Sequence, residues 1–148
     1  MKRKIVNPVI PGFYPDPSIC RVGDDYYIAC SSFELYPGIP VFHSKDLAHW
    51  EQIGHVMTMD NGFHVEKNSM VGGVMAPTLR YYDGLFYLIN ANFSDKGNYI
   101  VTAKNPAGPW SEPNWLDDVP GIDASVFFDD DGNCLLYTSP SPRDGLLS

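Results

Sequence analysis

The chain has 148 residues, about the size of one ordinary domain, which excludes a large multidomain assembly. Hydrophobic residues make up 44% of the sequence and charged residues 19%, a composition typical of a globular protein and not of a disordered one. The net charge of −8 would repel nucleic acid and anionic membrane surfaces, so neither is an expected partner.

Thirteen Gly, thirteen Pro and 14% aromatic residues favour short strands joined by tight turns, so we expect an all-β fold. No apolar run approaches the roughly 20 residues that cross a bilayer. The basic start of the chain is not followed by an apolar stretch of signal-peptide length. We therefore expect a cytoplasmic protein with no membrane partner.

In chain order, the first predicted element is a hairpin over residues 17–28, and residues 77–88 align with it without gaps at an offset of sixty. Each copy has an apolar strand after Pro-Ser or Pro-Thr and then an aromatic strand. The turns are predicted at residues 23–24 and 83–84, which combine Gly with Asp.

The same offset relates residues 44–50 to residues 102–110, and both segments end in Trp. Two hairpins therefore make one four-stranded unit. A third copy opens at residues 123–128, with a turn at residues 129–133. Units of this kind are typical of the blades of a β-propeller, which closes with about four to eight blades. The chain would form two blades and the start of a third; an all-β sandwich with an accidental internal match is the alternative.

The C-terminal residues do not continue the strand pattern of the third copy. From Cys134 the sequence resembles the translated read-through of a transposon-type sequencing adapter, and its Ser-Pro-Ser-Pro stretch would break the strand that should follow the turn. We therefore expect one domain over residues 1–133 and an artefactual tail over residues 134–148. A genuine Pro-rich surface tail is the alternative.

Asp16 is the first candidate for chemistry, because it lies between Pro15 and Pro17. Pro17 biases it toward an extended conformation and Pro15 fixes the approach, so its carboxylate would sit on a stiff backbone, as a catalytic base requires. Asp123 occupies the equivalent position in the third copy. The first strand of each propeller blade lines the central channel, so both carboxylates should converge on that axis; an ordinary Asp-Pro turn is the alternative.

Several segments together resemble one known family. They are residues 7–18, 21–27, 31–34, 43–47, 76–81, 121–123 and 127–132. They are similar to glycoside hydrolase family 43, above all to its β-xylosidase and α-L-arabinofuranosidase members, and the resemblance covers residues 5–133. It implies a five-bladed β-propeller whose central pocket hydrolyses glycosidic bonds with inversion.

The resemblance also implies roles for the two aspartates. Asp16 matches the general base that activates water, and Asp123 matches the carboxylate that tunes the pKa of the general acid and orients it. An inverting glycosidase separates base and acid by about 6.5–9.5 Å to admit the water. The family carries its general acid, a Glu, in a later blade. The glutamates of this chain lie elsewhere, at Glu34, Glu51, Glu66 and Glu112. The chain as written should therefore be inactive.

By the same resemblance Phe33, Ala76 and Ile122 match positions that line the sugar pocket, where an aromatic or small residue packs against a sugar ring. Met75 stands where many members have Trp, and Met can still cover a sugar face. This departure leaves the choice between xylose and arabinose open. The function expected is hydrolysis of xylo-oligosaccharides or arabinose-substituted xylan fragments; a non-catalytic carbohydrate-binding propeller and an unrelated small all-β domain are the alternatives.

No cofactor or metal is expected. The four histidines are scattered without a metal-type pair, and the acidic run at residues 129–133 lacks the ligand pattern of an EF-hand and is expected to be a hairpin turn. Cys20, Cys30 and Cys134 are expected to be reduced, buried thiols. The expected partner is a small carbohydrate substrate, and the oligomeric state stays open.

Overall fold

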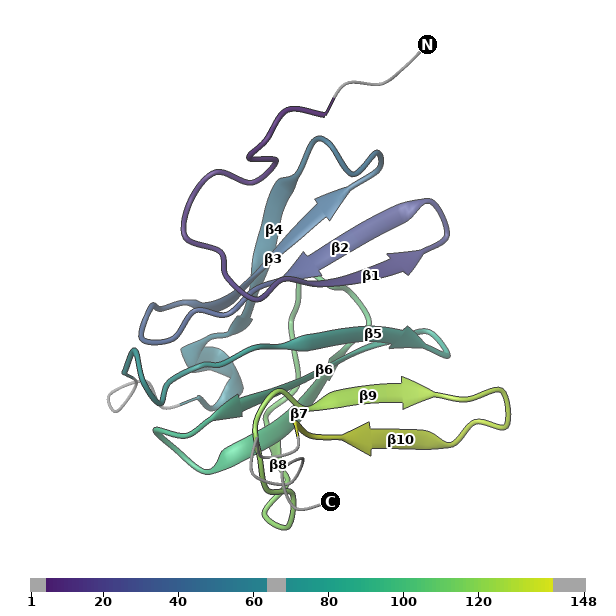
Figure 1. Cartoon of the computed structure of the whole chain (residues 1–148). Coiled ribbons are helices and arrows are strands. Elements are labelled where there is room, and N and C mark those ends of the chain that lie inside the picture. Colours follow the sequence, from purple (N-terminus) through teal and green to yellow (C-terminus); the bar gives the residue numbers. More distant parts are fainter. Residues whose placement is uncertain (1–4, 64–68, 140–148) are drawn as a thin grey trace, which may run out of the picture.

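The computed structural model describes residues 5–63 and 69–139, and these residues form almost only β-structure (Figure 1). β1–β4 make one antiparallel sheet, called blade 1 below, and β5–β8 make a second, blade 2. β9 and β10 pair as a third hairpin. The elements are β1 Ser18–Val22, β2 Asp25–Ala29, β3 Gly38–Ser44, β4 Glu51–Met57, the short 3₁₀ turn η1 Met59–Asn61, β5 Thr78–Tyr82, β6 Leu85–Asn92, β7 Gly97–Ala103, β8 Asn114–Trp115, β9 Ser125–Phe128 and β10 Cys134–Tyr137.

The three hairpin turns fall where the sequence predicts them. Two residues separate β1 from β2 and β5 from β6, and residues 129–133 separate β9 from β10. Gly23 and Gly84 have φ of 61° and 81°, a left-handed conformation that glycine adopts without steric cost. In both blades the first strand pairs with the second in the same register, with Ser18 opposite Ala29 and Thr78 opposite Ile89. The sixty-residue repeat is therefore structural.

Blades 1 and 2 pack against each other over a shared apolar core. The ring of Tyr27 on β2 meets the ring of Phe86 on β6 edge to face, with centroids 5.2 Å apart. Val41 and Leu88, from facing blades, are both fully buried in this core. Each such burial stabilises the fold by about 1.5–3 kcal/mol. At Gly54 the blades come so close that a Cβ would lie 2.6 Å from the carbonyl oxygen of Ala107.

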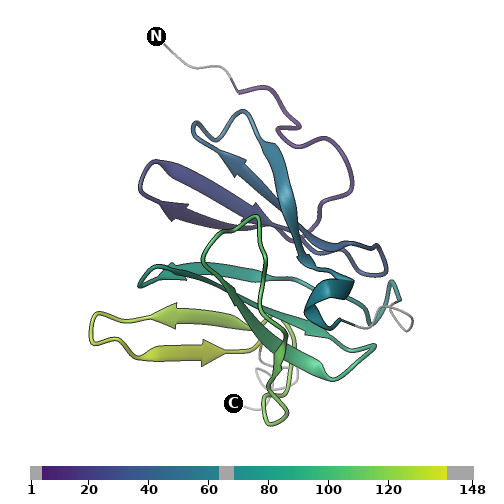
Figure 2. The same ribbon diagram turned by 180° about the vertical axis from the view of Figure 1, so that it is seen from behind.

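The first strands β1, β5 and β9 lie side by side and run in the same direction (Figures 1 and 2). The hydroxyl of Ser18 on β1 accepts a hydrogen bond from the backbone N–H of Leu79 on β5 (3.0 Å). Ile89 of blade 2 packs with Ala124 and Val126 of the third hairpin in a second core. The starts of the three strands therefore share one end of the molecule.

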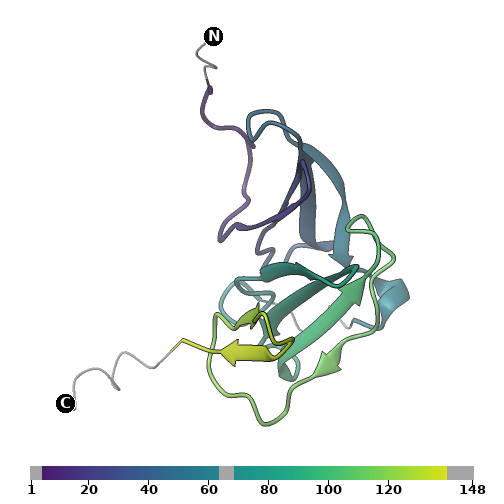
Figure 3. The same ribbon diagram turned by 90° about the vertical axis from the view of Figure 1, so that its right-hand side faces the viewer.

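The N-terminal segment packs on blade 1, on the side away from blade 2 (Figure 3). Its Tyr14 meets the ring of Phe42 edge to face at a centroid distance of 4.8 Å. Within residues 5–63 and 69–139 there is no helix of the length and apolarity that a bilayer crossing needs.

The structure bears on the expectations for the cysteines and for residues 134–148. Cys30 is buried and Cys20 half-buried, but Cys134 is exposed, because both faces of β10 are open to solvent, so the prediction of buried thiols is wrong for that residue. The residues Cys134–Tyr137 pair with β9 as a return strand. The assignment of residues 134–148 to an artefactual tail stays a prediction, and residues 140–148 lie outside the described part.

Candidate active site

Asp16 lies two residues before β1 and is held by Ser31, which lies two residues after β2. The hydroxyl of Ser31 donates a hydrogen bond of 2.5 Å to Oδ2 of Asp16, and the backbone N–H of Ser31 donates to the carbonyl of Pro15 (3.0 Å). Ser31 is buried, with 1% of its surface exposed, whereas Asp16 is exposed. A solvent-facing carboxylate is thus anchored through a buried hydroxyl.

The following proline predicts an extended backbone at Asp16. The backbone is instead left-handed, with φ of 52°. The N-terminal segment has to turn sharply into β1 here, and Asp tolerates the left-handed region better than most residues. The bonds from Ser31 hold that turn in place. The contacts with Ser31 therefore override the local conformational bias from Pro17.

The negative charge of Asp16 is also felt by Cys30. Burial raises the pKa of the Cys30 thiol to about 11, and the nearby Asp16 carboxylate adds to this rise. Cys30 therefore stays protonated near neutral pH and offers no thiolate that could compete with Asp16 as a base.

Phe33 lies two residues beyond Ser31 and begins the seam between the blades. Its backbone N–H and C=O bond the C=O and N–H of Val74 at 2.9 and 3.0 Å, and its ring lies 6.1 Å from the ring of Phe13. Phe13 is 54% exposed. A Cβ on Gly73 would overlap the carbonyl oxygen of Phe33, so this approach requires glycine. The rings of Phe13 and Phe33 form a tilted aromatic pair at this seam.

Met75 and Ala76 follow directly and lead into β5; both are half-buried. The N–H of Met75 donates to the carbonyl of Ala91 (2.9 Å), and its own carbonyl accepts from the side-chain amide of Asn90 (2.5 Å). Tyr99, fully buried, donates its hydroxyl to Oδ1 of Asn90 (3.2 Å), and burial raises the pKa of Tyr99 well above its ordinary value. A buried polar network thus fixes the backbone of Met75.

Asp123 and Ile122 precede β9. The side-chain amide of the buried Asn98 donates to the carbonyls of both Val119 and Gly121 at 2.9 Å, which ties the approach to Asp123 to blade 2. Asp123 has φ of 54°, close to that of Asp16, and is exposed; Ile122 is 41% exposed.

Asp16, Ala76 and Asp123 each stand two residues before a first strand, and those strands are adjacent and run the same way. All three residues therefore lie at the same end of the blades. The bridge from Phe33 to Val74 places Phe33 and Met75 there as well. The structure brings the predicted residues to one end, and their roles stay predictions.

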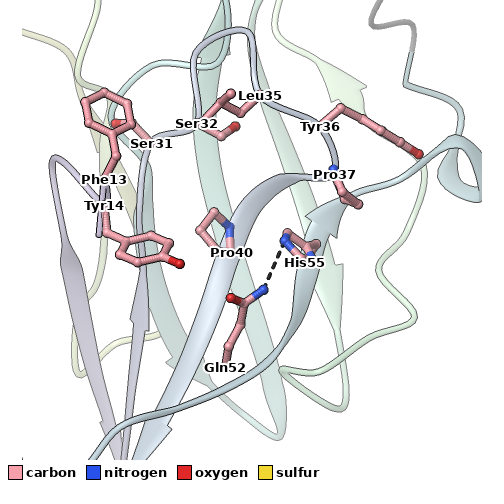
Figure 4. A pocket seen from close by; sticks show the side chains of 10 residues that line it. All are labelled: Phe13, Tyr14, Ser31, Ser32, Leu35, Tyr36, Pro37, Pro40, Gln52 and His55. Atoms are coloured by element: carbon pink, nitrogen blue, oxygen red, sulfur yellow. Dashed lines mark hydrogen bonds between the residues drawn. The ribbon is translucent and has the colours of Figure 1, made fainter. Parts of the chain in front are cut away.

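A separate cavity lies on blade 1 (Figure 4). It measures about 180 Å³, with Phe13, Ser31 and Ser32 at one end and His55, hydrogen-bonded to Gln52, at the other. None of the six predicted site residues lines it. Asp16 and Asp123 are exposed to solvent, whereas this cavity lies between the N-terminal segment and blade 1.

Among residues 5–63 and 69–139, no group of three or more His, Cys, Asp or Glu side chains is placed to hold a metal ion. His43 bonds Asp25 (2.6 Å) and His49 bonds Asp46 (2.7 Å), and these hydrogen bonds lower the pKa of both carboxyls. His64 lies outside the described residues. The acidic run is a hairpin turn as predicted, with Asp129 accepting the N–H groups of its own loop.

Sequence reasoning left three residues of this region without a role: Phe13, Ser31 and Asn98. Phe13 and Ser31 lie in segments that carry the family resemblance, so a signal was present, but their contacts join residues far apart in the chain. Asn98 gave no signal, because nothing local in a strand tells which loop an amide will bind.

Residues 5–146 match the sequence profile of the family described as Glycosyl hydrolases family 43. The chain belongs to this family. A xylosidase/arabinosidase of Butyrivibrio fibrisolvens is 55% identical over 143 residues, and a non-reducing end alpha-L-arabinofuranosidase of Bacteroides ovatus is 50% identical over 145. Each alignment covers 95% of this chain and 27% of the relative.

Solved structures of family 43 agree with the fold. The crystal structure of a xylan beta-1,4-xylosidase from Bacillus halodurans C-125 superposes with a TM-score of 0.83 at 47% identity, covering 90% of this chain and 27% of that one. The prediction of an all-β, five-bladed propeller is confirmed, with two blades and the hairpin of a third present here. The chain spans about 27% of the length of these family 43 relatives.

Proposed function

We propose that this chain supplies the general base and one wall of the sugar pocket of an inverting glycosidase that acts on xylo-oligosaccharides or arabinose-substituted xylan fragments. The observation that carries the proposal is the carboxylate of Asp16, which is exposed and anchored at Oδ2 by the buried Ser31. The names of two relatives, a xylosidase/arabinosidase and a non-reducing end alpha-L-arabinofuranosidase, support the substrate class.

In the proposed reaction Asp16 takes a proton from water, and the water oxygen attacks the anomeric carbon. The glycosidic C–O bond breaks on the opposite face as a general acid protonates the leaving oxygen. Asp123 orients that acid, which the family places in a later blade. Phe33, Met75, Ala76 and Ile122 contact the sugar ring.

Because the general acid lies in a later blade, we expect that the chain by itself binds sugar weakly and does not hydrolyse glycosides. None of the described glutamates stands at the head of a blade: Glu34 lies between β2 and β3, Glu51 begins β4, and Glu112 precedes β8. Removing a general acid costs an enzyme about 10²–10⁴ in rate.

A chimera tests the proposal. Residues 5–133 of this chain replace the aligned segment of the Butyrivibrio fibrisolvens relative, which contributes the remaining blades. We expect release of p-nitrophenol from aryl β-xyloside or aryl α-L-arabinofuranoside, with an inverted anomeric product seen by proton NMR. The unmodified relative is the control for assay and folding.

A folded chimera that hydrolyses neither glycoside contradicts the proposal. If that chimera still binds xylo-oligosaccharide in calorimetry, the segment belongs to a carbohydrate-binding propeller. Retention of anomeric configuration would contradict the assignment of Asp16 as a base.

A further inference from the structure

We call the start of a blade's first strand, with the residues just before it, the head of the blade. The repeat places one further residue beside each head. In blade 1, Asp16 stands two residues before the first strand and Ser31 two residues after the second. Sixty residues on, in blade 2, the equivalent positions hold Ala76 and Ala91; Ala91 lies within β6, and like Ser31 it stands two residues beyond the residue that pairs with the start of the first strand. The blade with an Asp at its head thus has a Ser opposite, and the blade without the Asp lacks the Ser.

In each blade, a backbone hydrogen bond joins the residue before the first of these positions to the residue at the second. In blade 1 the N–H of Ser31 donates to Pro15, the residue before Asp16; in blade 2 the N–H of Met75, the residue before Ala76, donates to Ala91. The side-chain hydrogen bond exists in blade 1 alone of the two. Blade 2 forms without it, so the hydroxyl is not a requirement of the blade.

We propose that Ser31 is a positioning residue for Asp16, an inference that rests on the proposed function of Asp16 as the base. The hydroxyl of Ser31 donates a hydrogen bond to Oδ2, and none of the described residues donates a hydrogen bond to Oδ1, the atom left to accept a proton from water. A buried hydroxyl restricts the rotation of an otherwise exposed carboxylate.

The choice of a hydroxyl fits that task. An O–H donor to a carboxylate makes a short, charge-assisted bond, yet it brings no positive charge that would neutralise the base. The neighbouring Ser32 does something else: its hydroxyl accepts the N–H of Ile39 (3.1 Å) and so supports the start of β3. Ser32 is equally buried, which makes it a matched control.

The test uses the chimera with Ser31→Ala, Ser31→Thr and Ser32→Ala. We expect Ser31→Ala to lower kcat by about 10- to 100-fold with KM changed less than about threefold, because a misplaced base slows the chemical step more than it weakens binding. Ser31→Thr, which keeps the hydroxyl, should recover most of kcat. Ser32→Ala should keep kcat within about twofold while lowering Tm.

A double-mutant cycle with Asp16→Asn separates positioning from general damage. If Ser31 acts through Asp16, Ser31→Ala lowers kcat no further in the Asp16→Asn background, and the Tm shifts of the two changes are not additive. Equal losses in both backgrounds, or unchanged kcat in Ser31→Ala, overturn the inference.

The Tm cycle needs no activity. If the unsubstituted chimera is folded but inactive, the proposed function fails. Coupled Tm shifts then still support the contact between Ser31 and Asp16, and additive shifts overturn it.

Discussion

The heads of blade 1 and of the third hairpin share one backbone design. Asp16 and Asp123 have φ of 52° and 54°, and each stands two residues before a first strand. Ser31 and Ser139 each stand two residues after the return strand, and each donates its backbone N–H to the residue before the Asp, at 3.0 and 2.9 Å.

The side chains differ. Ser31 is buried and its hydroxyl lies 2.5 Å from Oδ2 of Asp16, whereas Ser139 is exposed and its hydroxyl lies 3.5 Å from Oδ2 of Asp123. In blade 1 the return strand β2 pairs with β3 along its second edge. In the third hairpin, β10 is the last strand of its sheet and is exposed throughout. The repeat sets the backbone, and neighbouring strands set how firmly a side chain is held. Ser139 also lies in the segment predicted to be an artefactual tail.

The largest expected difference between the two heads is catalytic. In the chimera, Asp16→Asn should lower kcat by about 10²–10⁴-fold, because the amide cannot take the proton from water. Asp123→Asn should lower kcat less and shift the alkaline limb of the pH profile, because this residue acts through the acid. Steady-state kinetics on an aryl glycoside measure both. Equal losses with unchanged pH profiles would contradict the separate roles.

Substitutions in the core between the blades should destabilise the chain more than substitutions in the third hairpin. Leu88 is fully buried between blades 1 and 2, and Leu136 on β10 is 38% exposed. Leu88→Ala should reduce the free energy of unfolding of the chain by about 2–5 kcal/mol. Leu136→Ala should stay within about 0.5 kcal/mol, as for most surface changes. Urea unfolding followed by tryptophan fluorescence compares them, and comparable losses would mean that the third hairpin is packed as tightly as the blades.

The open third hairpin should also make the chain self-associate. Phe127 and Tyr137 are 58% and 64% exposed, and β9–β10 ends in unpaired strand edges. We expect concentration-dependent association in sedimentation velocity, reduced by Phe127→Lys with Tyr137→Lys. Lys substitution at Val71, an 89% exposed residue in the connection between the blades, is the control. A monomer at all concentrations would show that these surfaces are not adhesive.

The smallest expected effect is that of Ser139→Ala. Its hydroxyl makes a long contact in solvent, so Tm should not change measurably. Ser31→Ala should cost about 1–3 kcal/mol, because a buried hydrogen bond to a charged group is lost. Thermal unfolding of the two variants of the chain gives the comparison directly. A loss at Ser139 as large as that at Ser31 would make the two heads equivalent.

Much of the architecture could be predicted locally. Gly and Asp at residues 23–24 and 83–84 mark two-residue turns between an apolar strand and an aromatic strand, so the hairpin boundaries followed from turn chemistry. The offset of sixty residues then identified the blades. The positions of Asp16 and Asp123 at the heads of first strands followed from the same repeat.

The sequence by itself thus determined the repeat, the family and the placement of two aspartates, because these depend on short-range turn and strand patterns. Only the tertiary structure decided that Asp16 adopts a left-handed backbone against the bias of Pro17, that Ser31 anchors it, and that Asn98 ties down the approach to Asp123. Those contacts join residues 15 or more positions apart. They form only when β2 and β7 have packed into their sheets, which fixes partners that local propensity cannot choose.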